Sequence, residues 1–295
     1  MSDDNSMSVV NLGKLAKPAD TLIKKVSSAI GGVFEPWQIK RVAKANAEAS
    51  LIEAQTEIEI TDLHRRAMHR FVEEEANRQE NMEQITKKAL PQLKADSDPD
   101  RIEDDWVTNF FDKSRIVSDT EMQDLWARVL AGEANSPGTY SKRTVNFLGD
   151  LDKRDAEMFL SVCRFLWMIG SLTPLIFDSE APIYNDHGVT FTSLSHLDTI
   201  GLIQFGGISG FVRQGFPKSF AVAYCGQVLK LEMPNDKDNK LDIGKVLLTK
   251  VGYEIASVCS PLGVDGFYDY IKDKWKSFAP STEIAEQANP EGRPE

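Results

Sequence analysis

The stretch from residue 118 to residue 141, SDTEMQDLWARVLAGEANSPGTYS, determines how the centre of this 295-residue chain folds. Its first four residues form a capping box that opens a helix, and the apolar residues after them recur at three- and four-residue steps. The Asn-Ser-Pro-Gly turn at 135 to 138 stops that helix, and Ser141 can cap the next one. The stretch therefore predicts a helix, a tight corner and a second helix.

Amphipathic patterns with clear punctuation also flank this stretch. Ser97-Asp98-Pro99 is typical of a helix start, and Asp152 begins a pattern that runs through Trp167 and Ile169. Four amphipathic helices with short connections favour a compact bundle. We therefore predict a helical bundle over residues 95 to 170.

A long polar segment precedes the predicted bundle. Residues 39 to 90 contain no Gly or Pro and are rich in good helix formers, which favours one continuous helix within a segment from 37 to 94. Its apolar seam is thin and broken, so the helix either folds back on its own domain in pieces or pairs with the same helix of another subunit. The candidate residues for this self-association seam are Val42, Ala49, Ile52, Ile60, Leu63, Ala67 and Phe71.

The first 36 residues hold a polar tail and a short cationic amphipathic helix. Apolar residues recur along positions 15 to 33 at helical spacing, with several lysines between them. Such a helix either docks on a protein surface or lies on a membrane with its lysines at the headgroups, and docking is favoured because the stripe lacks aromatic anchors. The candidate residues for docking or membrane contact are Lys14, Lys17, Leu22, Lys24, Lys25 and Val26.

The spacing of apolar residues changes after residue 170, where strand-like runs appear between the helical ones. Residues 190 to 200 and 249 to 256 read as helices, and residues 202 to 205, 220 to 224 and 228 to 232 read as strands, while residues 245 to 248 lead into the second of these helices. This order resembles a winged-helix module over residues 171 to 278, and the Pro- and Glu-rich residues 279 to 295 are typical of a disordered tail. The predicted fold class is thus mainly α: an N-terminal amphipathic helix, a long coiled-coil-like helix, a central helical bundle and a C-terminal α+β winged-helix-like module.

The composition narrows the function classes. The chain carries 34 Lys and Arg residues against 45 Asp and Glu residues, a formal net charge of −11, and residues 193 to 200 of the candidate recognition helix carry no Lys or Arg. Direct nucleic-acid binding is therefore disfavoured.

The absence of a signal-like start and of a long apolar run predicts a cytoplasmic protein. Three widely spaced cysteines predict buried, reduced thiols.

No pattern diagnostic of catalysis occurs in the sequence. His64 and His69 lie five residues apart, so they point in different directions on a helix, and adjacent Ser195 and His196 cannot form a relay on theirs. The Gly-rich run at 205 to 210 lacks the residues of a phosphate-binding loop. We therefore expect a non-enzymatic protein with no catalytic residues, no metal ligands and no cofactor.

Several quoted stretches resemble a known family. The N-terminal pieces at 13 to 18, 29 to 31 and 35 to 36, the stretch Trp-Ala-Arg-Val-Leu-Ala-Gly-Glu-Ala-Asn-x-Pro-Gly at 126 to 138, and Ser-Lys-Arg-Thr at 141 to 144 are similar to the bacterial domain-of-unknown-function family 2806. The resemblance implies a bacterial, intracellular, largely helical protein with no assigned activity and no catalytic residues to carry over. A looser similarity, in the N-terminal helix and the layout, is to abortive-infection proteins of phage defence.

The corner between the two central helices is the candidate binding site. Arg128, Glu133, Lys142 and Arg143 are expected to lie near one another there. The leading hypothesis is a homo-oligomeric interaction protein with a protein partner of unknown identity, with phage defence as a candidate setting. The alternatives are a membrane-associated effector that uses the N-terminal helix, and a winged-helix nucleic-acid-binding regulator.

Overall fold

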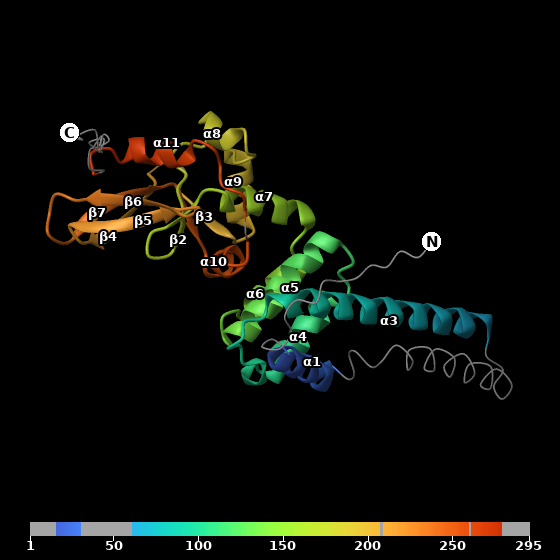
Figure 1. Ribbon diagram of the computed structural model, residues 1–295. Coiled ribbons are helices and arrows are strands. Elements are labelled where there is room, and N and C mark those ends of the chain that lie inside the picture. The colour runs from blue at the N-terminus through green and yellow to red at the C-terminus, as the bar shows by residue number, and fades with distance from the viewer. Residues whose placement is uncertain (1–15, 31–60, 207–208, 260, 279–295) are drawn as a thin grey trace, which may run out of the picture. The chain divides into compact units, whose positions relative to one another are not determined.

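The computed structural model describes residues 16–30, 61–206, 209–259 and 261–278, which fall into two compact units (Figure 1). The first unit contains the described residues up to Ala156, together with Ser257–Cys259. The second contains Glu157–Ala256 and the described residues after 260. The division falls within helix α7 (Lys153–Cys163), ahead of the residue 170 at which the sequence pattern changes.

The first unit is helical. It contains α1 (Ala16–Ile30), α3 (Asp62–Ala89), α4 (Asp104–Ser114), α5 (Thr120–Asn135) and α6 (Lys142–Gly149), with two short 3₁₀ turns at Leu90–Gln92 and Pro99–Arg101. The helices on either side of the predicted corner are confirmed. The N-cap of α5 is Asp119 rather than Ser118, because the Asp119 carboxylate accepts the backbone N–H groups of Glu121 and Met122.

Aromatic side chains fill the core of the helical unit. Phe110 of α4 lies between two tryptophans, with ring centroids 5.1 Å from Trp106 and 5.0 Å from Trp126. Trp126 is fully buried on α5, as the apolar face of the central stretch predicts. These large side chains bury more apolar area than any aliphatic residue, so they dominate the packing of the unit.

Helix α1 docks on the helical unit. Leu22 and Val26 lie on its inner face and are fully buried, and the helix packs against α4 and the 3₁₀ turn at Pro99–Arg101. The Lys25 ammonium forms an ion pair with Asp104 of α4 at 2.6 Å. The apolar face of α1 is therefore covered by protein in this structure.

Helix α3 begins at Asp62, so the prediction of one continuous helix from residue 39 to residue 90 is wrong at Thr61. Thr61 has an extended backbone with ψ of 154°, and its hydroxyl accepts the backbone N–H of His64. A threonine cap followed by an aspartate satisfies a free N–H and suits the positive end of the helix dipole, which outweighs the good helix propensity of the flanking residues. Residues 31–60 lie outside the described residues.

The second unit is built from antiparallel β-structure and short helices. Its strands are β1 (Leu166–Met168), β2 (Leu172–Pro174), β3 (Ile203–Phe205), β4 (Phe211–Phe216), β5 (Ser219–Tyr224), β6 (Gln227–Glu232), β7 (Asn239–Gly244) and β8 (Val246–Leu248). They form a four-stranded sheet in the order β2-β1-β5-β6 and two pairs, β3 with β8 and β4 with β7. Its remaining helices are α8 (Pro182–Asn185), α9 (Phe191–Thr199), α10 (Lys250–Ala256) and α11 (Phe267–Lys274).

The prediction of a mainly α fold is wrong, because three antiparallel sheets make the chain a mixed α and β protein. The three predicted strands are present, as β3, β5 and β6, but β1, β2, β4, β7 and β8 were not expected. The helix predicted to run to Ile169 ends at Cys163. Trp167 lies instead on β1, where its ring stacks on Tyr224 of the neighbouring strand at 5.3 Å. The α+β character of the C-terminal part is confirmed, and its winged-helix likeness stays a prediction.

The end of the inner strand β5, at Tyr224, is held by polar contacts. The Tyr224 hydroxyl accepts the backbone N–H of Val264 at 2.7 Å and donates to the carbonyl of Arg164 at 2.8 Å. A phenol is already protonated at physiological pH, and burial raises the pKa of Tyr224 further, to about 12, so its donor role extends to more alkaline pH.

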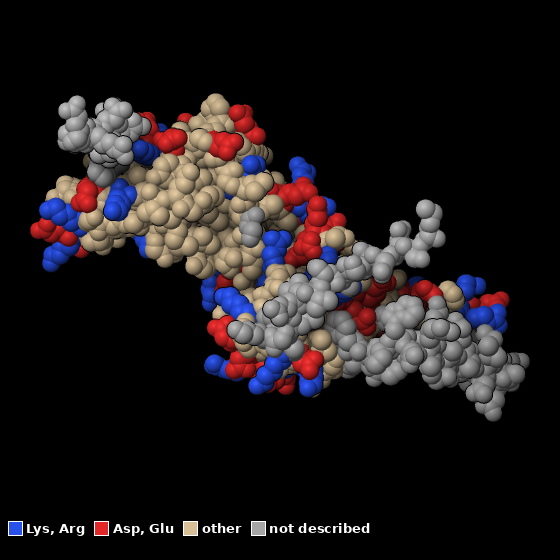
Figure 2. All heavy atoms as spheres, in the orientation of Figure 1, with Lys and Arg blue, Asp and Glu red and all other residues tan. Residues whose placement is uncertain are grey.

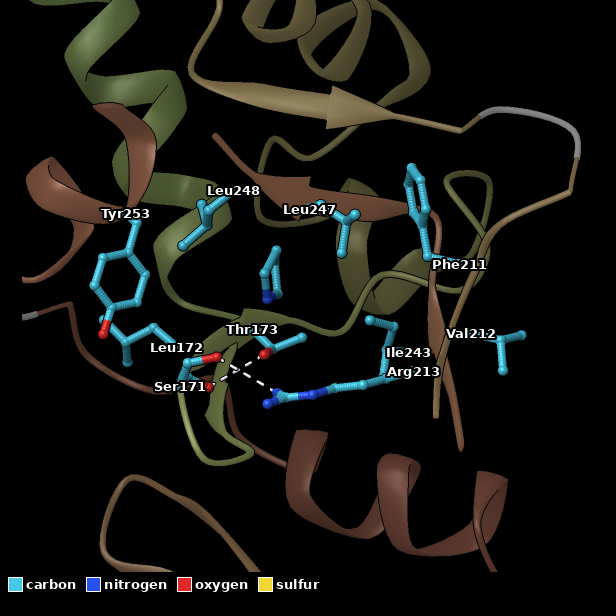
Figure 3. Close-up of a pocket in the computed structure, with 11 residues that line it drawn as sticks. Ser171, Leu172, Thr173, Phe211, Val212, Arg213, Ile243, Leu247, Leu248 and Tyr253 are labelled. Atoms are coloured by element: carbon cyan, nitrogen blue, oxygen red, sulfur yellow. Dashed lines mark hydrogen bonds between the residues drawn. The ribbon is translucent and has the colours of Figure 1, made fainter. Parts of the chain in front are cut away.

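Charged and uncharged side chains are distributed differently over the two units. In the view of Figure 2, blue and red side chains alternate over the helical unit, whereas uncharged side chains cover much of the second unit. The second unit also contains a pocket of about 370 Å³ bounded by β2, β4, β7, β8 and α10 (Figure 3).

The docking of α1 can be tested by truncating its inner face. We expect Leu22→Ala to lower the stability of the helical unit by about 2 to 5 kcal/mol, because Leu22 is fully buried and the change leaves a cavity. Lys24→Ala, at an exposed position of the same helix, is the matched control and should change stability by less than about 0.5 kcal/mol. Urea denaturation followed by circular dichroism measures both, and equal effects of the two changes would contradict the docked helix.

The N-cap of α5 predicts a pH dependence. The N–H groups of Met122 and Glu121 and the Lys153 ammonium hold the pKa of Asp119 below its ordinary value of 3.8. The carboxylate thus stabilises the fold above that ordinary value, and its contribution is lost as the pH falls through the lowered pKa. Asp119→Asn keeps a capping oxygen but removes the titration, so thermal melts between pH 2 and pH 5, about the range over which a carboxylate titrates, should depend less on pH than in the unmodified chain. An unchanged acid limb contradicts this role.

Candidate functional site

The predicted binding corner is held by a buried carboxylate. Glu133 lies at the end of α5 with 3% of its surface exposed. One of its oxygens accepts the backbone N–H of Gly138 at 2.6 Å, and the other accepts that of Tyr140 at 2.9 Å. A single side chain therefore ties the last turn of α5 to the loop that leads into α6.

Two further contacts fix the same loop. The Trp106 indole N–H donates to the carbonyl of Tyr140 at 2.7 Å, which joins α4 to the corner. The Tyr140 ring lies against Gly132, where an added Cβ would approach the ring to 2.7 Å. Gly132 is thus required by close packing as well as by its place near the helix end. The stretch around the corner therefore has a structural role, because its contacts pack α4, α5 and α6 together.

A pocket of about 480 Å³ opens at this corner. Glu133 and Lys142 both line it, and Arg101 supplies a second cation. Lys142 is exposed and lies 3.4 Å from the carboxylate of Asp105, so its charge is already partly compensated. The structure therefore brings together two of the four predicted residues.

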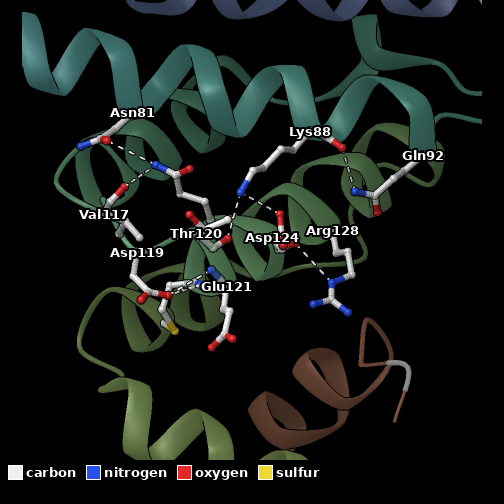
Figure 4. Close-up of polar contacts among 11 residues, drawn as sticks. Asn81, Lys88, Gln92, Val117, Asp119, Thr120, Glu121, Asp124 and Arg128 are labelled. Carbon is white, nitrogen blue, oxygen red and sulfur yellow. Dashed lines mark hydrogen bonds and ion pairs between the residues drawn. The ribbon is translucent and has the colours of Figure 1, made fainter. Parts of the chain in front are cut away.

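The other two predicted residues lie elsewhere. The Arg128 Nε donates to the carbonyl of Asp124 one turn earlier in its own helix, at 3.2 Å (Figure 4). Arg143 is exposed on α6 and does not line the pocket. Helical periodicity explains this separation, because Arg128 lies five residues before Glu133 and faces a different side of α5.

The predicted self-association seam lies partly on the first half of α3. Leu63 and Phe71 are 65% and 59% exposed, and Ala67 is exposed between them. Met68 and Val72 were not predicted, and they are 51% and 37% exposed beside that stripe. Their spacing of four residues was the signal that could have found them. The other predicted seam residues, Val42, Ala49, Ile52 and Ile60, lie outside the described residues.

The second half of α3 is anchored in the helical unit. Met82, Ile85 and Ala89 are buried in its packing against α5. The Lys88 ammonium contacts the carboxylate of Asp124 at 2.8 Å and the carbonyl of Thr120 at 2.9 Å, as Figure 4 shows. Because one end is held in this way, the orientation of the exposed half is set by a packed and hydrogen-bonded base.

The buried and exposed halves of α3 use the same face. At about 100° per residue, Leu63, Ala67 and Phe71 project onto the same side of the helix as Met82, Ile85 and Ala89. The apolar face that packs on α5 therefore continues along α3, and there its residues are exposed. We call the surface formed by Leu63, Ala67, Met68, Phe71 and Val72 the α3 apolar face.

Charges of both signs follow one another along this half of α3. Arg65, Arg66 and Arg70 come first, and three consecutive glutamates occupy positions 73 to 75. Ion pairs within the helix join Arg65 to Asp62 at 3.0 Å and Arg70 to Glu74 at 3.3 Å. Arg78 also pairs with Glu74 and Glu75, so both the basic and the acidic cluster are partly neutralised within their own helix.

Some candidate lysines of the N-terminal helix are exposed to solvent, and one forms an ion pair with the helical unit. Lys17 and Lys24 are exposed, Lys25 pairs with Asp104, and Lys14 lies outside the described residues. Among the described helices, none has the length and apolar character that crossing a membrane requires.

The possible metal ligands and the three cysteines can be located in the described part of the chain. No group of three His, Cys, Asp or Glu side chains within it is arranged to hold a metal ion. The expectation of three buried thiols holds for Cys163 alone, since Cys225 is exposed and Cys259 is half-buried. Cys225 occupies the tight turn between β5 and β6 with a φ of 46°, and such a turn places its side chain at the surface.

The role of Glu133 can be tested by removing its carboxylate. We expect Glu133→Ala to destabilise the helical unit by about 1 to 3 kcal/mol or more, because two backbone N–H groups lose a charged acceptor. Arg143→Ala, at an exposed residue of the same corner, should leave the melting temperature unchanged within the error of differential scanning calorimetry. If the two changes have equal effects, Glu133 does not hold the corner.

Comparison with known proteins adds the family. The family model described as "Protein of unknown function (DUF2806)" matches residues 65–272, more than two thirds of the chain. No curated protein and no solved structure matches the chain. The match includes most of α3, the whole corner around Glu133 and most of the second unit. The chain therefore belongs to the DUF2806 family of proteins of unknown function.

Proposed function

We propose that the protein is a non-enzymatic, self-associating interaction protein, in which the α3 apolar face pairs with the same face of a second copy. The observation that carries this proposal is the exposure of Leu63, Met68 and Phe71 on one side of a helix whose continuation is buried. A helix half that projects with exposed apolar residues is marginally stable alone, and covering these residues stabilises it.

The free energy gained by burying this face can be compared with the cost of association. Burial of a large apolar side chain contributes roughly 1.5 to 3 kcal/mol, and a symmetric pair covers each of the three largest residues twice. The loss of translational and rotational freedom on association costs about 4 to 15 kcal/mol. Leu63, Met68 and Phe71 are 51% to 65% exposed, so each recovers only about half of that value, and the gain is of the same order as the cost. We therefore expect weak association, in the micromolar range or above, with a dimer that exchanges with its monomers.

The charge sequence of α3 supports a second copy as the occupant. A surface with a basic segment at 65 to 70 followed by an acidic segment at 73 to 75 is complementary to itself when two copies run antiparallel. A parallel pair would instead place like charges side by side. An antiparallel pair has twofold symmetry, the commonest symmetry of soluble homo-oligomers.

The two alternative functions have less support. A membrane-associated effector requires α1 to leave the helical unit, because Leu22 and Val26 are buried there. A nucleic-acid-binding regulator requires a basic surface, whereas the face in Figure 2 carries charges of both signs over the helical unit and the chain has a net charge of −11.

Light scattering coupled to size-exclusion chromatography tests the proposal on the full chain. We expect a mass near twice the 33.0 kDa of one chain at concentrations in the tens of micromolar. The double change Leu63→Glu and Phe71→Glu should return the mass to that of a monomer, because it places charges in the paired face. Far-ultraviolet circular dichroism should change little, since both residues are exposed in the single chain.

The control lies on the opposite side of the same helix. Glu80→Lys changes an exposed residue about 180° away from Phe71 around the helix and outside both charged segments, so it should leave the dimer intact. A monomeric mass for the unmodified chain at all concentrations would overturn the proposal and point to a segment of the same chain as the cover of the face. Loss of the dimer with Glu80→Lys alone would show that pairing uses another side of α3.

A further inference from the structure

The pocket of the second unit has walls of two kinds. Phe211, Leu247 and Leu248 form an apolar side, and Thr173 and Arg213 lie across from them (Figure 3). The pocket measures about 370 Å³, near the lower end of the roughly 300 to 1,000 Å³ that is usual for small-molecule sites. Its size and lining suit a small ligand with an apolar body.

Arg213 reaches the pocket from β4 and contacts the turn between β1 and β2. Its Nη1 donates to the carbonyl of Ile169 and lies 3.4 Å from the hydroxyl of Ser171. Gly170 between them has a φ of +70°, a conformation that suits glycine and lets the turn present that carbonyl. The Arg213 guanidinium also lies 5.6 Å from the centre of the Phe216 ring. These contacts hold the side chain in one orientation.

The charge of Arg213 has no opposite partner in the part of the chain that the structure describes. Its contacts there are a carbonyl, a hydroxyl and a ring, and none is a carboxylate. Among the described residues, Nε and Nη2 donate no hydrogen bond, so one edge of the guanidinium is available. A half-buried cation without a counter-ion attracts an anion, and the two parallel N–H groups of that edge match a carboxylate.

We propose that this pocket binds a small amphipathic monocarboxylate, with its carboxylate on the free edge of Arg213 and its apolar body against Phe211, Leu247 and Leu248. Burial of the apolar body supplies affinity, and Arg213 supplies the orientation and the preference for an anion. Tyr253, at 42% exposure, lies at another side of the pocket, and its hydroxyl forms no hydrogen bond with described residues.

The alternative is that the contacts of Arg213 have only a structural role. It would tie β4 to the β1–β2 turn, and its replacement would lower stability without any effect on a ligand. The proposal instead requires a saturable site that distinguishes charge at constant size. The two roles therefore separate in a binding experiment on the unmodified chain.

Isothermal titration calorimetry with octanoate, octanol and octylammonium provides that experiment. On the full, unmodified chain we expect octanoate to bind at one site per chain, with at least tenfold lower affinity for octanol and no saturable binding of octylammonium. Arg213→Gln should weaken octanoate binding at least tenfold. Lys240→Gln removes an exposed cation from β7, the partner strand of β4, and should leave the octanoate affinity unchanged.

Three outcomes would overturn the proposal. The first is an absence of saturable octanoate binding below its micelle concentration, and the second is equal affinity for octanoate and octanol. The third is equal weakening by Arg213→Gln and Lys240→Gln, which would show a general electrostatic attraction. Since the comparison of the three ligands needs no variant, a failure of Arg213→Gln to fold leaves the test decisive.

Discussion

The buried carboxylate of Glu133 is the interaction on which the helical unit depends. By accepting the N–H groups of Gly138 and Tyr140, it sets the angle between α5 and α6 and holds Tyr140 in place. Tyr140 in turn receives the Trp106 indole N–H, so α4 is tied to the same point. A buried anion is costly unless it is fully hydrogen-bonded, and this one obtains its partners from the backbone of the loop that it organises.

That rigid corner gives the rest of the unit a fixed base. Helix α5 offers one side to the corner and another to α3, where Lys88 and the buried residues Met82 and Ile85 complete the packing. Helix α3 therefore leaves the unit in a defined direction with its apolar face still exposed. The proposed pairing with a second copy follows from this one-sided anchoring, since a helix held at one end presents its free half in a reproducible orientation.

The second unit follows a different principle. Its strands are short. Stacked aromatic rings such as Trp167 on Tyr224 join neighbouring strands of one sheet, and other side chains reach across to neighbouring turns. Arg213 is one of these side chains, and it differs from the others because its charge has no carboxylate partner among the described residues. A structural role and the proposed binding role are compatible in this residue, because Nη1 contacts the β1–β2 turn and the other edge of the guanidinium is the one proposed to meet a ligand.

The sequence alone determined the elements whose signals are local. Caps, turns and helical periodicity located α5, α6 and α9, and alternation located β5 and β6, because these signals depend on residues a few positions apart. Only the tertiary structure decided the rest. Three-residue strands such as β1 and β2 have too few residues for a periodic signal and exist because a partner strand supplies their hydrogen bonds. The separation of Arg128 from Glu133, and the approach of Arg213 to the β1–β2 turn 42 residues before it in the chain, likewise depend on how distant segments pack.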